Sequence, residues 1–414
     1  MSLAWVSVAA LVLAVALSCT TTINVGLLAL ALAMIVGVFL AGMSPGAVLE
    51  GFPTDLLFTL LGVTLLFAIA ECNGTLARVT ARAVRLCRGH AGILPFMFFG
   101  IGFAIATIGA GATPASALLA PPAMAAAARA GVSPFLMAVM VGNGTLAGTL
   151  SPFAPTGIVA HGVMERIGLG GVEWQTFAYN ALAHAVVGIG AFLLFGGWKL
   201  FGARAQGRQV QAQAEAGAME RRNWLTVAGI AVFIGAVAVF GLDVGMIGLL
   251  VAVVLILLRT VDEAKAIQRV PWGVILMVTG VTVLISMLRE TEGLALITNG
   301  IANVSTPATI NPIVAFGAGL VSVYSSTSGV VLPAFLPMAP ELATQLGGLD
   351  PLGIAWSMAV SASLVDLSSL STVGALFMAG AAPGTDVRKL FNALLAWGLS
   401  MAVVGALLCW ALFG

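Results

Sequence analysis

The feature of this sequence that most restricts its fold is a series of long, uninterrupted apolar runs. A helix needs roughly 20 mainly apolar residues to cross a bilayer, and about 17 can suffice. Runs of about this length recur along the whole chain, near 3–18, 23–42, 54–71, 93–109, 134–164, 174–199, 223–241, 243–259, 271–288, 308–324, 352–380 and 388–412. Because a membrane β-barrel would instead show short alternating segments, the runs predict an all-α polytopic membrane protein.

Composition and charge agree with this class. Only 8% of the 414 residues are charged, against about 25% in a typical soluble chain, so a water-exposed surface cannot be assembled from them. The formal net charge of +1 provides no basic field for nucleic acid, and we expect no nucleic-acid partner. Membrane lipid is the expected surrounding of the protein.

Two polar connections are informative. Residues 75–90 carry arginines at helical spacing with apolar residues between them, which predicts an amphipathic helix on the membrane surface. The charged, Gln/Ala-rich segment 201–222 is the one stretch that resembles a linker, and it divides the protein into halves.

The halves contain similar short sequences at a spacing of about 217 residues. The matched pairs are Gly62–Leu66 with Gly280–Leu284, Phe99–Gly102 with Phe316–Gly319, and Ser151–Gly157 with Ser368–Gly374. Three matches in register, with the same order of apolar runs, predict an internal repeat.

The distribution of arginine and lysine predicts the orientation of the repeats. When the Arg-rich surface helix is placed in the cytoplasm, only Arg166 and Arg289 face outward, which is a strong positive-inside bias. In the same arrangement a hairpin at 93–130 enters from the cytoplasm and a hairpin at 308–345 enters from outside. The two repeats are therefore expected to have inverted topology.

Four places interrupt the apolar helices with glycine, proline and hydroxyl residues. Two are hairpin tips, at Gly109–Pro114 and Ser325–Gly329, and two are breaks within helices, at Gly142–Gly157 and Ser361–Thr372. Exposed backbone groups are intolerable against lipid, so such backbone survives where it lines a cavity or coordinates a ligand. Freed carbonyls and hydroxyls suit Na⁺, and half-helix N-termini suit an anion. Small and hydroxyl residues also serve plain helix packing, but four clusters at repeat-equivalent places favour a binding site.

Ionisable residues within the apolar runs are few. Asp366 falls inside the second broken helix, where cation ligation or proton coupling is expected. His161 and His184 fit hydrogen-bonded packing better, although a histidine can carry a coupling proton. No Arg or Lys lies near the hairpin tips or breaks in the sequence. A bound anion would therefore require co-bound cations, because an unpaired dianion in a low-dielectric site is very costly.

These interruptions resemble the divalent anion/sodium symporter group of the ion-transporter superfamily, and within it the MatC-like dicarboxylate (malonate) carriers, over about 23–412. Family members carry Ser-Asn-Thr at each hairpin tip, which binds Na⁺ and a substrate carboxylate. Here Ser325-Ser326-Thr327 is similar to the second copy, and Ala110-Gly111-Ala112-Thr113 occupies the place of the first. The first tip thus offers backbone groups and one hydroxyl.

The resemblance implies a homodimer in the bacterial inner membrane, with a scaffold and a transport domain that moves like an elevator. Scaffold helices are expected at 1–53 and 223–270. The first inverted repeat covers 54–200, with the surface helix, the cytoplasmic hairpin 93–130 and the broken helix 134–164. After the cytoplasmic linker 201–222 and the second scaffold segment, the second repeat covers 271–414, with the outer hairpin 308–345 and the broken helix 352–380.

The resemblance also implies site residues. The substrate carboxylates are expected at Thr113, Thr156, Ser326, Thr327 and Thr372. One Na⁺ is expected among Gly109, Ala110, Ala112, Asn143 and Thr149, and a second near Ser325, Gly329, Ser363 and Asp366. No transition metal and no cofactor besides Na⁺ as coupling ion is expected.

The leading functional hypothesis is Na⁺-coupled import of a small, malonate-like dicarboxylate. A second hypothesis is a carrier of another organic anion, coupled to protons through Asp366 or a histidine. An anion channel is a more remote alternative. An intramembrane enzyme is disfavoured, because the sequence has neither HExxH nor GxSxG and only one well-buried carboxylate.

Overall fold

The structure is a computed structural model that describes residues 2–21, 23–85, 91–201 and 217–414. The described residues form helices and no strand, as expected where every backbone group must be paired without water. Residues 86–90 of the predicted surface helix and most of the predicted linker lie outside the described residues.

The described residues of the first half form ten α-helices and three short irregular helices. They are α1 Leu3–Thr20, α2 Val25–Met34, η1 Ile35–Leu40, α3 Pro45–Leu49, α4 Thr54–Cys72, α5 Thr75–Arg85, α6 Leu94–Ile105, η2 Ala106–Ala110, α7 Ala112–Ala130, α8 Pro134–Ala147, α9 Pro155–Arg166, α10 Glu173–Leu194 and η3 Gly197–Phe201.

The second half follows a similar order. Its helices are α11 Arg221–Phe240, α12 Val244–Leu257, α13 Glu263–Arg269, α14 Trp272–Glu290, α15 Gly293–Asn303, α16 Ile310–Tyr324, η4 Thr327–Val331, α17 Leu332–Phe335, η5 Leu336–Met338, α18 Ala339–Gln345, α19 Pro351–Leu364, η6 Val365–Leu367, α20 Thr372–Ala379 and α21 Val387–Phe413.

Six helical stretches of the described chain are long and apolar enough to cross a membrane, and six shorter apolar helices of 10–17 residues accompany them. Several of the shorter helices are short because the chain turns or breaks, as at the end of Leu94–Ala110 and of Pro134–Ala147. The protein is therefore a multi-pass membrane protein.

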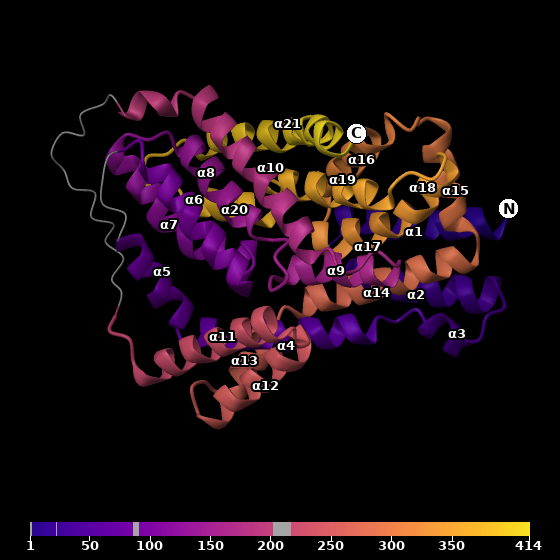
Figure 1. Cartoon of the computed structure of the whole chain (residues 1–414), viewed down its shortest axis with the longest axis horizontal. Coiled ribbons are helices and arrows are strands. Elements are labelled where there is room, and N and C mark those ends of the chain that lie inside the picture. The colour runs from indigo at the N-terminus through magenta and orange to yellow at the C-terminus, as the bar shows by residue number, and fades with distance from the viewer. Residues whose placement is uncertain (1, 22, 86–90, 202–216) are drawn as a thin grey trace.

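The matched glycines Gly62 and Gly280 occupy equivalent helix crossings. Helix α4 packs against α12, and α14 packs against α2; Figure 1 shows α4 and α12 with α11 and α13 along one edge of the molecule. A Cβ at Gly62 would lie 2.2 Å from the carbonyl oxygen of Gly245, and one at Gly280 would lie 2.0 Å from that of Gly26. Only glycine allows the two backbones to approach so closely.

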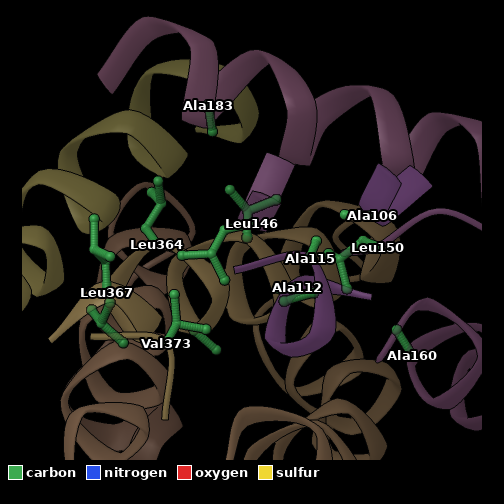
Figure 2. Packing of buried hydrophobic residues seen from close by; sticks show 14 of the residues in the cluster. Ala106, Ala112, Ala115, Leu146, Leu150, Ala160, Ala183, Leu364, Leu367 and Val373 are labelled. Atoms are coloured by element: carbon green, nitrogen blue, oxygen red, sulfur yellow. The ribbon is translucent and has the colours of Figure 1, made fainter. Parts of the chain in front are cut away.

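The two predicted hairpins and the two predicted helix breaks lie together. The chain of the first hairpin runs through α6, η2 and α7, and both arms pack against α8. In the second hairpin α16 is the first arm, and η4, α17, η5 and α18 form the returning arm. Helix α16 packs against α19, the first half of the second broken helix. Figure 2 shows the apolar centre of this region, where Leu146, Leu364 and Val373 gather with small side chains of the first hairpin.

We expect Gly62→Ala to lower the stability of the protein by about 1–3 kcal/mol, because the added methyl group meets backbone that cannot move aside. The measurement is thermal unfolding of the detergent-purified protein. Gly235→Ala in α11 is the matched control, since nothing lies within 4 Å of a Cβ there, and it should leave the melting temperature unchanged or raise it. Equal melting temperatures for the two variants would contradict the close crossing.

Candidate functional site

The tip of the first hairpin is formed by two glycines with positive φ angles. Gly109 has φ 121° and Gly111 has φ 80°, a region that residues with a Cβ rarely adopt. A Cβ at Gly109 would also collide with the ring of Phe67, at 2.2 Å. The turn ends the first arm at Ala110 and lets α7 start at Ala112 without a side-chain cap.

The first broken helix is tied to this hairpin by a serine. Helix α8 ends at Ala147, and α9 begins only at Pro155. In the gap, Ser151 Oγ donates to the carbonyl of Thr107 at 2.7 Å and accepts from the backbone N–H of Phe153 at 3.1 Å. The N-terminus of α9 has no side-chain cap, so its first N–H groups remain without a partner inside the helix.

The second broken helix solves the same problem with more hydroxyl groups. Helix α19 ends at Leu364, a short turn carries Asp366, and α20 begins at Thr372. Ser371 Oγ accepts from the N–H of Gly374 at 3.1 Å and donates to the backbone carbonyls of Asp366 and Ser368. It therefore caps α20 and holds the turn against it.

The matched residues Gly157 and Gly374 perform the same packing role in the two breaks. A Cβ at Gly157 would lie 2.0 Å from the carbonyl oxygen of Ser151, and one at Gly374 would lie 2.0 Å from that of Ser368. Each glycine lets the second half of its helix rest directly on the preceding turn.

A cavity of about 330 Å³ connects the first hairpin tip with both breaks. We call it the threonine cavity, because Thr113, Thr156 and Thr372 line it at the first turns of α7, α9 and α20. Three helix N-termini therefore open onto one space, and two of them have no side-chain cap. Positive helix ends and free N–H groups favour an anion at such a place. The hydroxyl residues Thr64 and Ser328 and the backbone of Gly109 and Ala110 also line the threonine cavity.

An arginine also lines the threonine cavity, although none lies near the tips or breaks in the sequence. Arg269, at the end of α13, forms an ion pair with Glu71 at the end of α4, and both side chains line the cavity. The sequence shows only which residues neighbour the interruptions along the chain, whereas α13 packs against α4 and brings the guanidinium to the cavity from a distant part of the chain.

Asp366 is surrounded by hydroxyl groups of the second hairpin. Thr327 Oγ1 donates to Asp366 Oδ1 at 2.6 Å, and Ser322 Oγ lies 3.5 Å from the same oxygen. The two hydroxyls contact each other at 2.5 Å, and both also reach the carbonyl of Ala362. The two hydroxyls thus lie within hydrogen-bonding distance of each other, of the carboxylate and of the carbonyl. We call these groups the oxygen-rich cluster, and oxygen ligands of this kind are those that hard cations prefer.

His184 joins the two halves at the centre of the molecule. Its ring nitrogens contact Asn143 Oδ1 at 2.9 Å and Ser363 Oγ at 3.1 Å, and the imidazole is fully buried. Asn143 Nδ2 in turn donates to the carbonyl of Val139 at 2.8 Å. The packing role preferred for this histidine thus has specific partners, one from each broken helix.

The predicted site residues separate into three places. Thr113, Thr156, Thr372, Gly109 and Ala110 line the threonine cavity, whereas Ala112 is buried beside it. Thr327 and Asp366 form the oxygen-rich cluster, and Ser326 Oγ accepts from the N–H of Gly329 at 3.0 Å within the second tip, which follows Ser325. Asn143 and Ser363 contact His184, and Thr149 is buried in the first break.

Besides Glu71 and Arg269, four hydroxyl residues at these places were not predicted as site residues from the sequence. Ser328 and Thr64 line the threonine cavity, and Ser322 belongs to the oxygen-rich cluster. Thr107 Oγ1 at the first tip is buried with no hydrogen-bond partner in the described part of the chain. Thr107 and Ser328 lie at or beside recognised interruptions of the sequence. Thr64 and Ser322 lie in regular helix, where sequence alone gives no reason to single them out.

A second cavity, of about 460 Å³, lies on the other half of α4. Asp55 and Thr59 line it, together with the histidine, carboxylate and arginine side chains of His161, Glu165, Arg166, Glu173 and Asp243. The threonine cavity follows α4 from Thr64 to Glu71. Since Asp55 and Glu71 are about 24 Å apart at 1.5 Å per helical residue, the two cavities lie against opposite halves of α4.

Comparisons with known proteins agree with this architecture. Residues 1–149 match the family model of the dicarboxylate carrier protein MatC N-terminus, which confirms the resemblance over the part of the chain that contains the first hairpin. No curated protein matches the sequence. The crystal structure of the Alcanivorax borkumensis YdaH transporter is similar in fold, with a TM-score of 0.56 and 14% identity over 88% of this chain and 86% of that one. The family match and the fold indicate a membrane transporter rather than an enzyme.

We expect His184→Leu to lower the free energy of unfolding by about 1–3 kcal/mol, because it leaves the side-chain oxygens of Asn143 and Ser363 buried without a partner. His161→Leu is the control, since Nε2 of His161 has no hydrogen-bond partner in the described part of the chain. Thermal unfolding in detergent should show the larger loss for His184. Equal losses would argue against the bridge.

Proposed function

We propose that the protein is a secondary active transporter that imports a small dicarboxylate, of the size of malonate, together with Na⁺. The observation that carries this proposal is the convergence of three helix N-termini and three threonine hydroxyls on the threonine cavity. A carboxylate bound there would accept hydrogen bonds from backbone N–H groups and threonine hydroxyls. It would not need an arginine in the innermost part of the site. The MatC family match supports a dicarboxylate as substrate.

The volume of the cavity supports a small substrate. About 330 Å³ lies at the lower end of the range of small-molecule pockets. It accommodates a three- or four-carbon diacid together with several waters.

The oxygen-rich cluster around Asp366 is the proposed second cation site. No Lys or Arg takes part in its hydrogen bonds, so the charge of Asp366 requires either a cation or a proton. The oxygens gathered around Asp366 are the ligand type that hard cations take, and we propose Na⁺ as that cation. The first cation is proposed at the first tip, where the backbone of Gly109 and Ala110 and the unpaired Thr107 hydroxyl provide oxygens.

Alternating access between inverted repeats is the proposed mode of transport. Gly62 and Gly280 allow similar close helix crossings, and Gly157 and Gly374 allow similar close contacts at the two breaks. These two pairs of equivalent positions support a repeat. The cavities against opposite halves of α4 support two access routes, with the threonine cavity beside the end that carries Glu71 and Arg269. We propose that this end faces the cytoplasm of a bacterium and that the hairpins and broken helices move, as an elevator, against scaffold helices such as α2, α4, α12 and α14. A homodimer is the proposed assembly.

We expect malonate to raise the melting temperature of the purified protein only when Na⁺ is present, because a ligand stabilises by about 2.7 kcal/mol at one hundred times its Kd. In Asp366→Asn, the addition of Na⁺ should no longer enable malonate to raise the melting temperature. Asp262→Asn is the control, since Asp262 is an exposed helix cap and asparagine caps equally well. Uptake into proteoliposomes that needs a pH gradient and no Na⁺, and that Asp366→Asn abolishes while malonate still binds, would favour proton coupling instead.

We expect Thr156→Val to raise the KM for malonate about tenfold, because it removes one hydroxyl donor to a charged group while keeping the size of the side chain. The measurement is the concentration dependence of radiolabelled malonate uptake. Thr344→Val, at an exposed threonine of α18 that lines neither cavity, should leave KM unchanged. An unchanged KM in Thr156→Val would remove α9 from the substrate site.

A further inference from the structure

The ion pair between Glu71 and Arg269 stands at the edge of the threonine cavity, and the proposed function does not use it. Both side chains line the cavity, and Arg269 is the one basic residue among the described residues of its lining. Glu71 comes from the last turn of α4, and Arg269 comes from the last turn of α13.

Helix stability does not explain the position of Glu71. The C-terminal end of a helix carries partial negative charge, which disfavours a carboxylate there. Arg269 offsets this by donating a hydrogen bond from Nη2 to Glu71 Oε1. That bond and the charge of Glu71 raise the pKa of Arg269 above its ordinary value, so the guanidinium remains charged at any physiological pH.

The ion pair is accessible to a solute, and its separation costs little free energy. The side chains of Glu71 and Arg269 are 31% and 58% exposed, and exposed ion pairs contribute only about 0–1 kcal/mol. A carboxylate from the cavity can therefore replace Glu71 on the guanidinium without a large loss of stability. Glu71 is itself a carboxylate on Arg269, so the geometry already accepts the chemical group that the substrate would present.

We propose that Arg269 is a specificity-determining residue of the carrier, which receives one carboxylate of a dianionic substrate at the mouth of the threonine cavity in exchange for Glu71. The proposal rests on the proposed dicarboxylate transport. Arg269 would raise the local concentration of dianions at this face, and Glu71 would keep the guanidinium occupied when no substrate is present, so that monoanions bind it poorly.

This exchange predicts opposite effects for the two partners. Arg269→Gln should raise the KM for malonate measured from the face that carries this pair, by about threefold to fivefold. Glu71→Gln should lower the same KM by a similar factor, because it frees the guanidinium. The double variant E71Q/R269Q should behave like Arg269→Gln, since Glu71 acts only through Arg269. Arg269→Lys, which keeps the positive charge, should have a KM close to that of the wild-type protein.

The measurement is malonate transport in proteoliposomes sorted by orientation, so that each face is assayed separately. The KM at the opposite face should not change in any variant, and this also verifies that each variant is folded. The effects should shrink in high choline chloride, because exposed charges are screened. Malonate should respond more strongly than butyrate, which carries a single charge.

Glu220→Gln is the matched control. Glu220 pairs with Arg78 at 2.7 Å and with Arg222 at 2.8 Å, and neither arginine lines the threonine cavity. If Glu71→Gln and Arg269→Gln shift KM in the same direction, or shift both faces equally, the pair is structural and the inference is wrong. If the wild-type protein and Glu220→Gln move no dicarboxylate at all, the proposed function fails first.

Discussion

The arrangement of the site depends on one constraint, which is that a backbone polar group inside a membrane must have a partner. The hairpin tip at Gly109 and the two helix breaks interrupt the helical ladder in the middle of the fold. Some of the freed groups are satisfied within the protein, as where Ser151 binds the carbonyl of Thr107 and Ser371 caps α20. The N–H groups at the starts of α7 and α9 have no side-chain cap, and they open on the threonine cavity. Under the proposed function, an anion completes this arrangement.

The two halves use the same backbone solution with different chemistry. Gly157 and Gly374 let each broken helix rest on its own turn. Around the first tip the polar groups are mainly backbone, with the hydroxyls of Thr107 and Thr113 beside them. Around the second tip they are side chains, centred on Asp366. This asymmetry concentrates negative charge in the second half, and His184 links the two halves through one hydrogen bond to each.

Charge balance is the remaining requirement on an anion carrier. A dianion placed against three helix N-termini gains partial positive charges, but these are equivalent to only about half a charge each. Under the proposed mechanism, cations at the oxygen-rich cluster and at the first tip supply the rest. Arg269 stands outside the innermost site, where it is exposed enough to exchange partners. A strongly held arginine inside the cavity would bind the substrate tightly and slow its release.

Much of this protein could be predicted from its residues in order. Apolar runs and scarce charges establish a helical membrane protein, because lipid permits few other folds. Glycine, proline and hydroxyl clusters mark the hairpin tip at Gly109 and the break at Asp366, because these residue types break helices wherever they occur. The short matches about 217 residues apart point to equivalent packing, which the glycine crossings show directly.

Other features depended on which helices meet. Arg269 is distant from every interruption in the sequence, yet it lines the threonine cavity because α13 packs on α4. Thr64 and Ser322 lie in unbroken helices, and nothing local separates them from packing residues. The division of the predicted ligands between cavity, cluster and histidine bridge likewise follows from side-chain directions at the breaks. Local patterns report how the backbone is interrupted, whereas long-range contacts between helices decide which side chains share a space.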